Sequence, residues 1–169
     1  MKMIELHENG LDIQFRIREN GVVELADFSS QEVKKAPMEP KEDICYPAVE
    51  IHRSGTGSLN MHAYKNNINQ SSVDFVYENH ELKAQDGGKE LEIVMVSPEK
   101  LKAVYHMRLF DGVPAVQTWT EIINEGSEEQ GLTYVSSFMY QGISRGGEKP
   151  YYKKTDIYVP FNSWCCEAQ

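Results

Sequence analysis

The segment from Leu11 to Arg18 alternates strictly between apolar and polar side chains. A period of two predicts a β-strand with one buried face and one face in water. Asn9-Gly10 precedes this strand and Asn20-Gly21 follows it, and Asn-Gly is the strongest short sequence signal for a type I′ hairpin turn. We therefore expect an antiparallel meander of three strands, over residues 3–8, 11–19 and 22–28.

Similar short strand patterns continue along the rest of the chain. They are separated by turn clusters such as Asp86-Gly87-Gly88, Asp111-Gly112 and Asn124-Glu125-Gly126. No long helix is expected, because Pro37 and Pro40 interrupt the one segment that begins like a helix. The pattern predicts an all-β fold, a large antiparallel β-sandwich. Its further strands are expected at residues 47–52, 59–64, 73–78, 80–85, 91–96, 101–110, 115–124, 132–140 and 156–161.

The size and charge of the chain limit its partners. Its 169 residues are enough for one domain with a full core. A net charge of −9 disfavours nucleic acid and anionic membranes, and no apolar run reaches the roughly 20 residues that a membrane helix needs. The start of the sequence lacks the apolar core of a secretory signal, and Cys45, Cys165 and Cys166 show no disulfide or zinc-site spacing. We expect a cytoplasmic protein with reduced thiols, with no nucleic-acid or membrane partner.

The sequence shows no signature of catalysis or of metal binding. The five histidines are scattered, and His7 and His106 occupy polar positions of alternating strands, which predicts exposed side chains rather than ligands. There is no Gly-x-Ser-x-Gly elbow, and the segment 55–60 lacks the third glycine of a dinucleotide loop. The acidic residues of the long loop 29–46 are typical of a solvated surface. We therefore expect no catalytic residue, no metal and no cofactor in this chain.

The two tryptophans lead to different predictions. Trp119 lies in the middle of a predicted strand, where a tryptophan is typically a core residue with its indole N–H bonded locally. Trp164 follows the turn-like segment 160–163 near the end of the chain. It has two open interpretations, a stacking platform for a sugar ring or a plug between this domain and another part of the protein.

Two segments in the second half of the chain carry a family resemblance. The strand pair 101–112 and 116–126 closes on Ile122-Ile123-Asn124-Glu125-Gly126. The ending Asn162-Ser163-Trp164-Cys165-Cys166-Glu167 is similar to an Asn-x-Trp-x-x-Glu passage into a catalytic barrel. Together they resemble the N-terminal β-supersandwich domain of glycoside hydrolase family 36, the bacterial-type α-galactosidases. The resemblance covers nearly the whole chain and implies a sandwich over residues 1–163, with 164–169 beginning a linker to a barrel absent from this chain.

The resemblance also implies an activity for the parent protein. Family 36 members are retaining glycosidases whose two catalytic aspartates lie in a (β/α)8 barrel, with carboxyl groups about 5–5.5 Å apart, and they use no cofactor. The parent protein is then expected to hydrolyse terminal α-galactosides such as those of melibiose or raffinose type. This domain is expected to be non-catalytic, to pack on the barrel and to support a homo-oligomer.

One loop of this domain is implied to reach the substrate. In tetrameric family members such a loop enters a neighbouring subunit's active site with a pattern similar to Asp-x-Arg-x-Pro-Ala. Asp43, Pro47 and Ala48 match that pattern, whereas Cys45 stands at the arginine position. The missing guanidinium removes a forked donor suited to sugar hydroxyls. The resemblance therefore implies Asp43 as a substrate contact.

Two other interpretations stay open. In a free-standing carbohydrate-binding module, Trp164, Tyr151 and Tyr152 would stack on a sugar while Asn162 and Lys153 bond its hydroxyls. In the other interpretation the chain is a structural β-sandwich whose alternation is common to many sugar-associated domains. The candidate substrate contacts are thus Asp43, Tyr151, Asn162 and Trp164.

Overall fold

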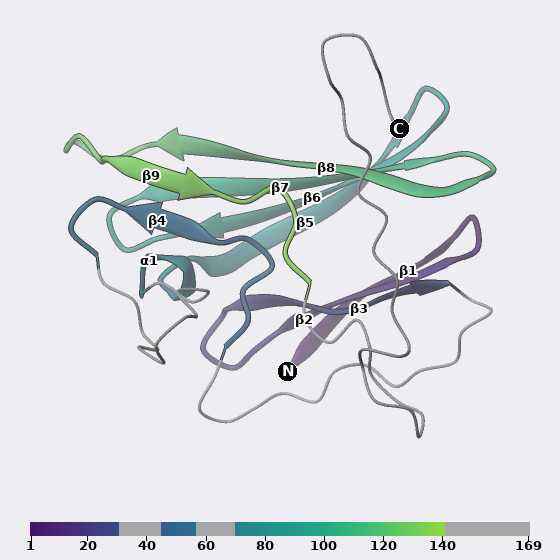
Figure 1. The fold of residues 1–169 in the computed structure, drawn as a ribbon, viewed down its shortest axis with the longest axis horizontal. Helices are drawn as coiled ribbons and strands as arrows, with labels where there is room; N and C mark the ends of the chain where they lie inside the picture. Colours follow the sequence, from purple (N-terminus) through teal and green to yellow (C-terminus); the bar gives the residue numbers. More distant parts are fainter. Residues whose placement is uncertain (31–44, 57–69, 141–169) are drawn as a thin grey trace, which may run out of the picture.

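The computed structural model describes residues 1–30, 45–56 and 70–140, which form antiparallel sheets. A three-stranded sheet faces a four-stranded sheet, and a two-stranded sheet lies near the short helix α1 (Figure 1). The predicted all-β sandwich is confirmed. Within the described ranges, no helix is long and apolar enough to cross a membrane. The three-stranded sheet contains β1 (Lys2–Glu8), β2 (Leu11–Ile17) and β3 (Val23–Ser30). The four-stranded sheet contains β5 (Val76–Gln85), β6 (Gly88–Val96), β7 (Leu101–Phe110) and β8 (Val113–Asn124). The two-stranded sheet contains β4 (Ile51–Arg53) and β9 (Leu132–Val135), and α1 spans Gln70–Val73.

One hydrophobic core fills the space between the two larger sheets. At its centre Phe15 of β2 meets Tyr105 of β7 edge to face, with ring centroids 5.7 Å apart. Alternate residues of β1, β2, β6 and β7 point into this core, which confirms the predicted period of two in these strands. The residues that build it include Ile4, Leu6, Ile13, Phe15, Ile17, Leu91, Ile93, Met95, Ala103, Tyr105, Met107 and Leu109.

The two Asn-Gly turns of the meander differ from each other. In Asn9-Gly10 both residues have positive φ angles, 51° and 84°, as the predicted type I′ turn requires. In the second turn only Gly21 has a positive φ, 86°, and the backbone N of Arg18 donates to the carbonyl of Val22 at 2.9 Å. The side chain of Asn20 accepts a hydrogen bond from the N–H of Val22 at 3.3 Å, a local bond that keeps Asn20 out of the left-handed region. The type I′ prediction is therefore wrong at this turn, which is a longer loop with a left-handed glycine.

The predicted strands 73–78 and 80–85 merge into a single strand, β5, which begins only at Val76, whereas Val73 ends helix α1. Its pairing with β6 is continuous except for a register shift between Tyr77 and Asn79. A β-bulge of this kind bends a strand without ending it. The polar residues around position 79 therefore mark a bulge rather than a turn.

Two other predicted strands are shorter in the structure. β4 begins at Ile51 rather than at residue 47, because Pro47 has no N–H to donate and the N–H of Ala48 bonds instead to the carbonyl of Val23 at 2.7 Å. β9 ends at Val135 rather than at residue 140. The predicted strands 59–64 and 156–161 lie outside the described residues.

Candidate functional site

The predicted substrate contacts lie outside the residues that the structure describes. These residues are Asp43, Tyr151, Asn162 and Trp164, together with Tyr152 and Lys153 of the binding-module interpretation. The predicted linker 164–169 also lies outside them. The roles of these residues stay predictions. Within the described residues, the features that bear on function are the base of the loop 29–46 and two clusters of ionisable side chains.

The end of the loop 29–46 is anchored on the β2–β3 turn. The backbone N of Tyr46 donates to Oε1 of Glu24 at 2.9 Å. Nδ2 of Asn20 lies 3.5 Å from Sγ of Cys45, which is a half-buried free thiol. Cys45, which stands at the arginine position of the family pattern, therefore contacts Asn20 of the same domain. These two contacts fix where the loop rejoins the sandwich.

Glu24 is the buried carboxylate of this anchor. Its side chain is 1% exposed, and Oε1 also accepts a hydrogen bond from Nη1 of Arg18 at 3.1 Å. Nε of the buried Arg16 lies 3.7 Å from Oε2. A carboxylate in such a site depends on its cationic neighbours, because desolvation disfavours an isolated buried charge. Glu24 therefore stabilises the base of the loop.

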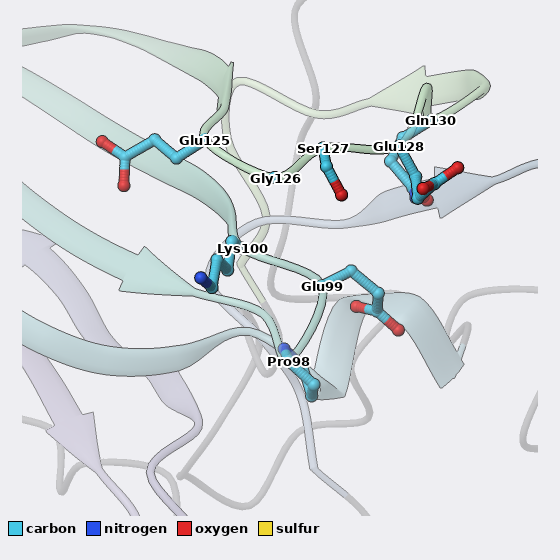
Figure 2. Close-up of a pocket in the computed structure, with 8 residues that line it drawn as sticks. All are labelled: Pro98, Glu99, Lys100, Glu125, Gly126, Ser127, Glu128 and Gln130. Atoms are coloured by element: carbon cyan, nitrogen blue, oxygen red, sulfur yellow. The ribbon is translucent and has the colours of Figure 1, made fainter.

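An open groove of about 540 Å³ lies between the β6–β7 turn and the loop that precedes β9. Figure 2 shows the turn 98–100 on one wall and the segment 125–130 on the other. Glu99, Glu125 and Glu128 line it, but no aromatic side chain among the described residues does. Oε1 of Glu125 accepts a hydrogen bond from Nζ of Lys102 at 2.5 Å. The groove thus offers carboxylates without a stacking platform for a sugar.

Glu99, which lines this groove, is held by side chains of its own domain. Nη1 of the buried Arg53 lies 2.7 Å from Oε2 of Glu99, and Nη2 of the same arginine donates to Asp74 beside α1 at 3.1 Å. Burial raises the pKa of the Glu99 carboxyl, but hydrogen bonds from its own backbone, Arg53 and Ser97 outweigh burial and lower that pKa below its usual value. A general acid of a glycosidase needs a raised pKa. Glu99 is therefore suited to an ion pair rather than to acid catalysis.

A second cluster lies on the outward face of the four-stranded sheet. Glu90 and Glu92 are two residues apart on β6 and so share one face, and Glu92 pairs with His106 of β7. Nδ1 of His106 lies 2.8 Å from Oε1 of Glu90 and 4.0 Å from Oε1 of Glu92. One oxygen of each glutamate and one ring nitrogen of the histidine all lie within 4.8 Å of one another. We call these three residues the outer cluster.

The surroundings of the outer cluster contradict two predictions. His106 is expected to be exposed, yet its side chain is only 9% exposed. Trp119 is expected in the core, yet it lies half-buried on the outward face, opposite His106 in the register of β7 and β8. The two rings stack with centroids 4.6 Å apart and an interplanar angle of 4°. Trp119 thus covers a histidine that alternation alone assigns to solvent, whereas His7 is 56% exposed, as predicted.

The register between strands explains why the outer cluster could not be found from the sequence. Its members come from two strands, and no spacing along the chain relates Glu90 to His106. The signal that was available was weak, since a Glu-x-Glu pair on an alternating strand is common on protein surfaces.

Neither a protein-family model nor a curated protein matches this chain. Solved structures do match it in fold. The GH36 alpha-galactosidase AgaA from Geobacillus stearothermophilus aligns with a TM-score of 0.53 and 14% sequence identity, over 78% of this chain and 23% of that chain. A doubly substituted form of that enzyme in complex with stachyose aligns with the same TM-score and coverage at 12% identity. The chain thus spans less than a quarter of these structures and has the fold of one part of them, which confirms the structural resemblance expected from the sequence.

Proposed function

We propose that this chain is the non-catalytic N-terminal domain of a retaining α-galactosidase that hydrolyses terminal α-galactosides. The observation that carries this proposal is the alignment of 78% of the chain with only 23% of a GH36 alpha-galactosidase. An all-β unit of this size has no room for a (β/α)8 barrel, which takes about 250 residues. Hydrolysis is therefore assigned to a barrel elsewhere in the parent protein.

The described carboxylates support a non-catalytic role. A retaining glycosidase needs two carboxyl groups about 5–5.5 Å apart, of which one is protonated in the resting enzyme. Against the effect of burial, hydrogen bonds from its own backbone, Arg53 and Ser97 lower the pKa of the Glu99 carboxyl, which favours its ionised form. Glu24 is buried against Arg16 and Arg18. Both carboxylates therefore suit structural ion pairs.

Exposed apolar side chains on β8, on β9 and in the segment after β9 support packing on a barrel. Ile123, Leu132, Tyr134 and Phe138 are each at least 40% exposed. β9 follows the edge of β8 in Figure 1, and Oγ1 of Thr120 donates to the carbonyl of Ser136 at 3.0 Å. Apolar groups left exposed on a protein surface can be buried by a partner. We assign these side chains to contacts with the barrel of the same cytoplasmic protein, in an assembly that is a homo-oligomer.

The activity is tested on the full product of the native gene. Its action on an α-galactoside, followed by proton NMR, should release the sugar with its anomeric configuration retained. The 169-residue chain alone should give no hydrolysis. The proposal is overturned if the full product does not hydrolyse α-galactosides while this chain binds them, with tryptophan quenching that Trp164→Ala abolishes. That result would assign the chain to the carbohydrate-binding modules.

We further propose that Asp43 contacts the substrate of a neighbouring subunit. Its match to the loop pattern of tetrameric family members supports this role. Asp43→Ala in the parent enzyme should raise KM, and Glu42→Ala, which removes a charge from the same loop, should leave KM unchanged. Equal KM and kcat in the native and Asp43→Ala enzymes would exclude the contact.

A further inference from the structure

We propose that the outer cluster of Glu90, Glu92 and His106 binds a first-row divalent metal ion, with Zn²⁺ as its typical occupant. This inference does not depend on the proposed function. An imidazole nitrogen together with two carboxylates is a donor set that suits Zn²⁺ better than the harder Ca²⁺ or Mg²⁺.

The spacing of the three donor atoms is close to that of a metal site. In a tetrahedral site with bonds of about 2.0–2.2 Å, neighbouring ligand atoms lie about 3.3–3.5 Å apart. Oε1 of Glu90 is nearer to Nδ1 of His106 than this, at 2.8 Å, and Oε1 of Glu92 is farther, at 4.0 Å. Small rotations of two half-buried glutamate side chains would therefore complete the three protein ligands.

Lys83 orients one of these glutamates. Its Nζ donates to Oε2 of Glu92 at 2.5 Å, so that Oε1 is the oxygen left facing His106. Carboxylates that ligate metals are typically hydrogen-bonded through their second oxygen in this way. The hydrogen bond from Lys83 thus leaves Oε1 of Glu92 available as a monodentate metal ligand.

The far side of the imidazole gives independent support. Nε2 of His106 is buried and has no hydrogen-bond partner in the described part of the chain. The nearest carboxylate oxygen on that side is Oε2 of Glu121, 3.8 Å away. If Nδ1 carries the proton and donates it to Glu90, the bare lone pair of Nε2 faces a carboxylate, which is unfavourable.

A metal on Nδ1 removes this conflict. The single proton of the neutral ring then resides on Nε2 and points toward Glu121. A metal-bound histidine almost always donates its other N–H to a carboxylate or carbonyl, which fixes the tautomer. The stacked ring of Trp119 holds the imidazole plane in place. The outer cluster therefore has three ligands, an orienting lysine and a carboxylate for the second nitrogen.

The test is titration of the tag-free 169-residue chain with Zn²⁺ in a calorimeter. We expect one ion per chain, with His106→Gln and Glu92→Gln each weakening the affinity at least about tenfold. His52→Gln is the matched control, because His52 also pairs with a glutamate, Glu50, at 2.8 Å but does not belong to the cluster. This control should bind Zn²⁺ like the native chain. Circular dichroism of each variant confirms that the sandwich is folded.

Trp119 supplies a second readout. Co²⁺ bound at the cluster should quench the emission of the tryptophan stacked on its ligand. Trp119→Phe should keep Co²⁺ binding while losing most of this quenching, whereas Glu92→Gln should lose both at the same Co²⁺ concentration. The inference is overturned if a folded native chain binds no Zn²⁺, or binds it equally well in all variants. The three side chains would then be linked by hydrogen bonds alone, without a metal ion. Because no sugar is used, the result is independent of whether the parent protein is an α-galactosidase.

Discussion

Gly21 of the β2–β3 turn lies directly against Val76 at the start of β5. A Cβ atom on Gly21 would lie 2.8 Å from the Cβ of Val76, which is closer than two non-bonded carbon atoms approach in proteins. The carbonyl of Gly21 also accepts a hydrogen bond from the backbone N of Tyr77 at 2.8 Å. The two larger sheets therefore meet at a point where only a residue without a side chain fits.

We expect Gly21→Ala to lower the free energy of unfolding by about 2–4 kcal/mol, the sum of a left-handed backbone penalty and a steric clash. Gly112→Ala is the control, since Gly112 has a similar φ of 70° but no atom within 4 Å of the added Cβ. It should show the backbone penalty alone, about 1–2 kcal/mol. Urea unfolding measures both, and equal losses would contradict a close contact with Val76.

Glu24→Gln should destabilise the chain by about 3 kcal/mol, because it removes a buried carboxylate that faces Arg16 and Arg18. Glu125→Gln breaks an ion pair with Lys102 at the surface and should cost less than about 1 kcal/mol. Urea unfolding of the two variants under the same conditions compares them. A loss for Glu24→Gln no larger than for the surface pair would show that the buried charges are not coupled.

The ion pair of Glu99 with Arg53 should make stability depend on pH. Because folding lowers the pKa of this carboxyl, its contribution is present above the usual value of 4.5 and is lost as the pH falls through the lower folded-state value. Native protein should therefore be more stable than Glu99→Gln at pH 7, and the difference should shrink below pH 4.5. Thermal unfolding across this range measures it. Glu128→Gln, which changes an exposed carboxylate of the same groove, is the control and should show the same pH dependence of stability as the native protein. A difference in stability between native protein and Glu99→Gln that does not change with pH would contradict this prediction.

Phe15→Ala should cost about 3–5 kcal/mol, since it leaves a cavity opposite Tyr105 at the centre of the core. Phe138→Ala removes the same number of atoms from a side chain that is 40% exposed and should cost clearly less. Chemical denaturation followed by circular dichroism gives both values. Similar losses of unfolding free energy for the two variants would contradict a core centred on Phe15.

The strands were largely predictable because alternation is a local property. β7 begins at Leu101 and ends at Phe110, as predicted, and β2 buries the apolar set that its pattern indicates. The predictions failed where local bonds or single residues decide the backbone. The side chain of Asn20 changes a turn type, and a bulge after Tyr77 joins two predicted strands into one.

The sites were much less predictable. His106 is buried because β8 brings Trp119 beside it, and that register depends on the turn at 111–112 and on the packing of the whole sheet. No spacing along the sequence contains this information. The substrate contacts inferred from the family resemblance, Asp43 among them, stay predictions because they lie outside the described residues.

The bulge in β5 has a consequence for solubility. β5 lies at the edge of the four-stranded sheet and pairs there with β6 alone among the described strands. Such an edge presents free N–H and carbonyl groups on which a strand from another molecule can assemble. The bulge distorts this row after Tyr77, and Glu78, Glu81 and Lys83 add charge along it. β5 is therefore a poor template for edge-to-edge aggregation, which helps to keep the chain dispersed at high concentration.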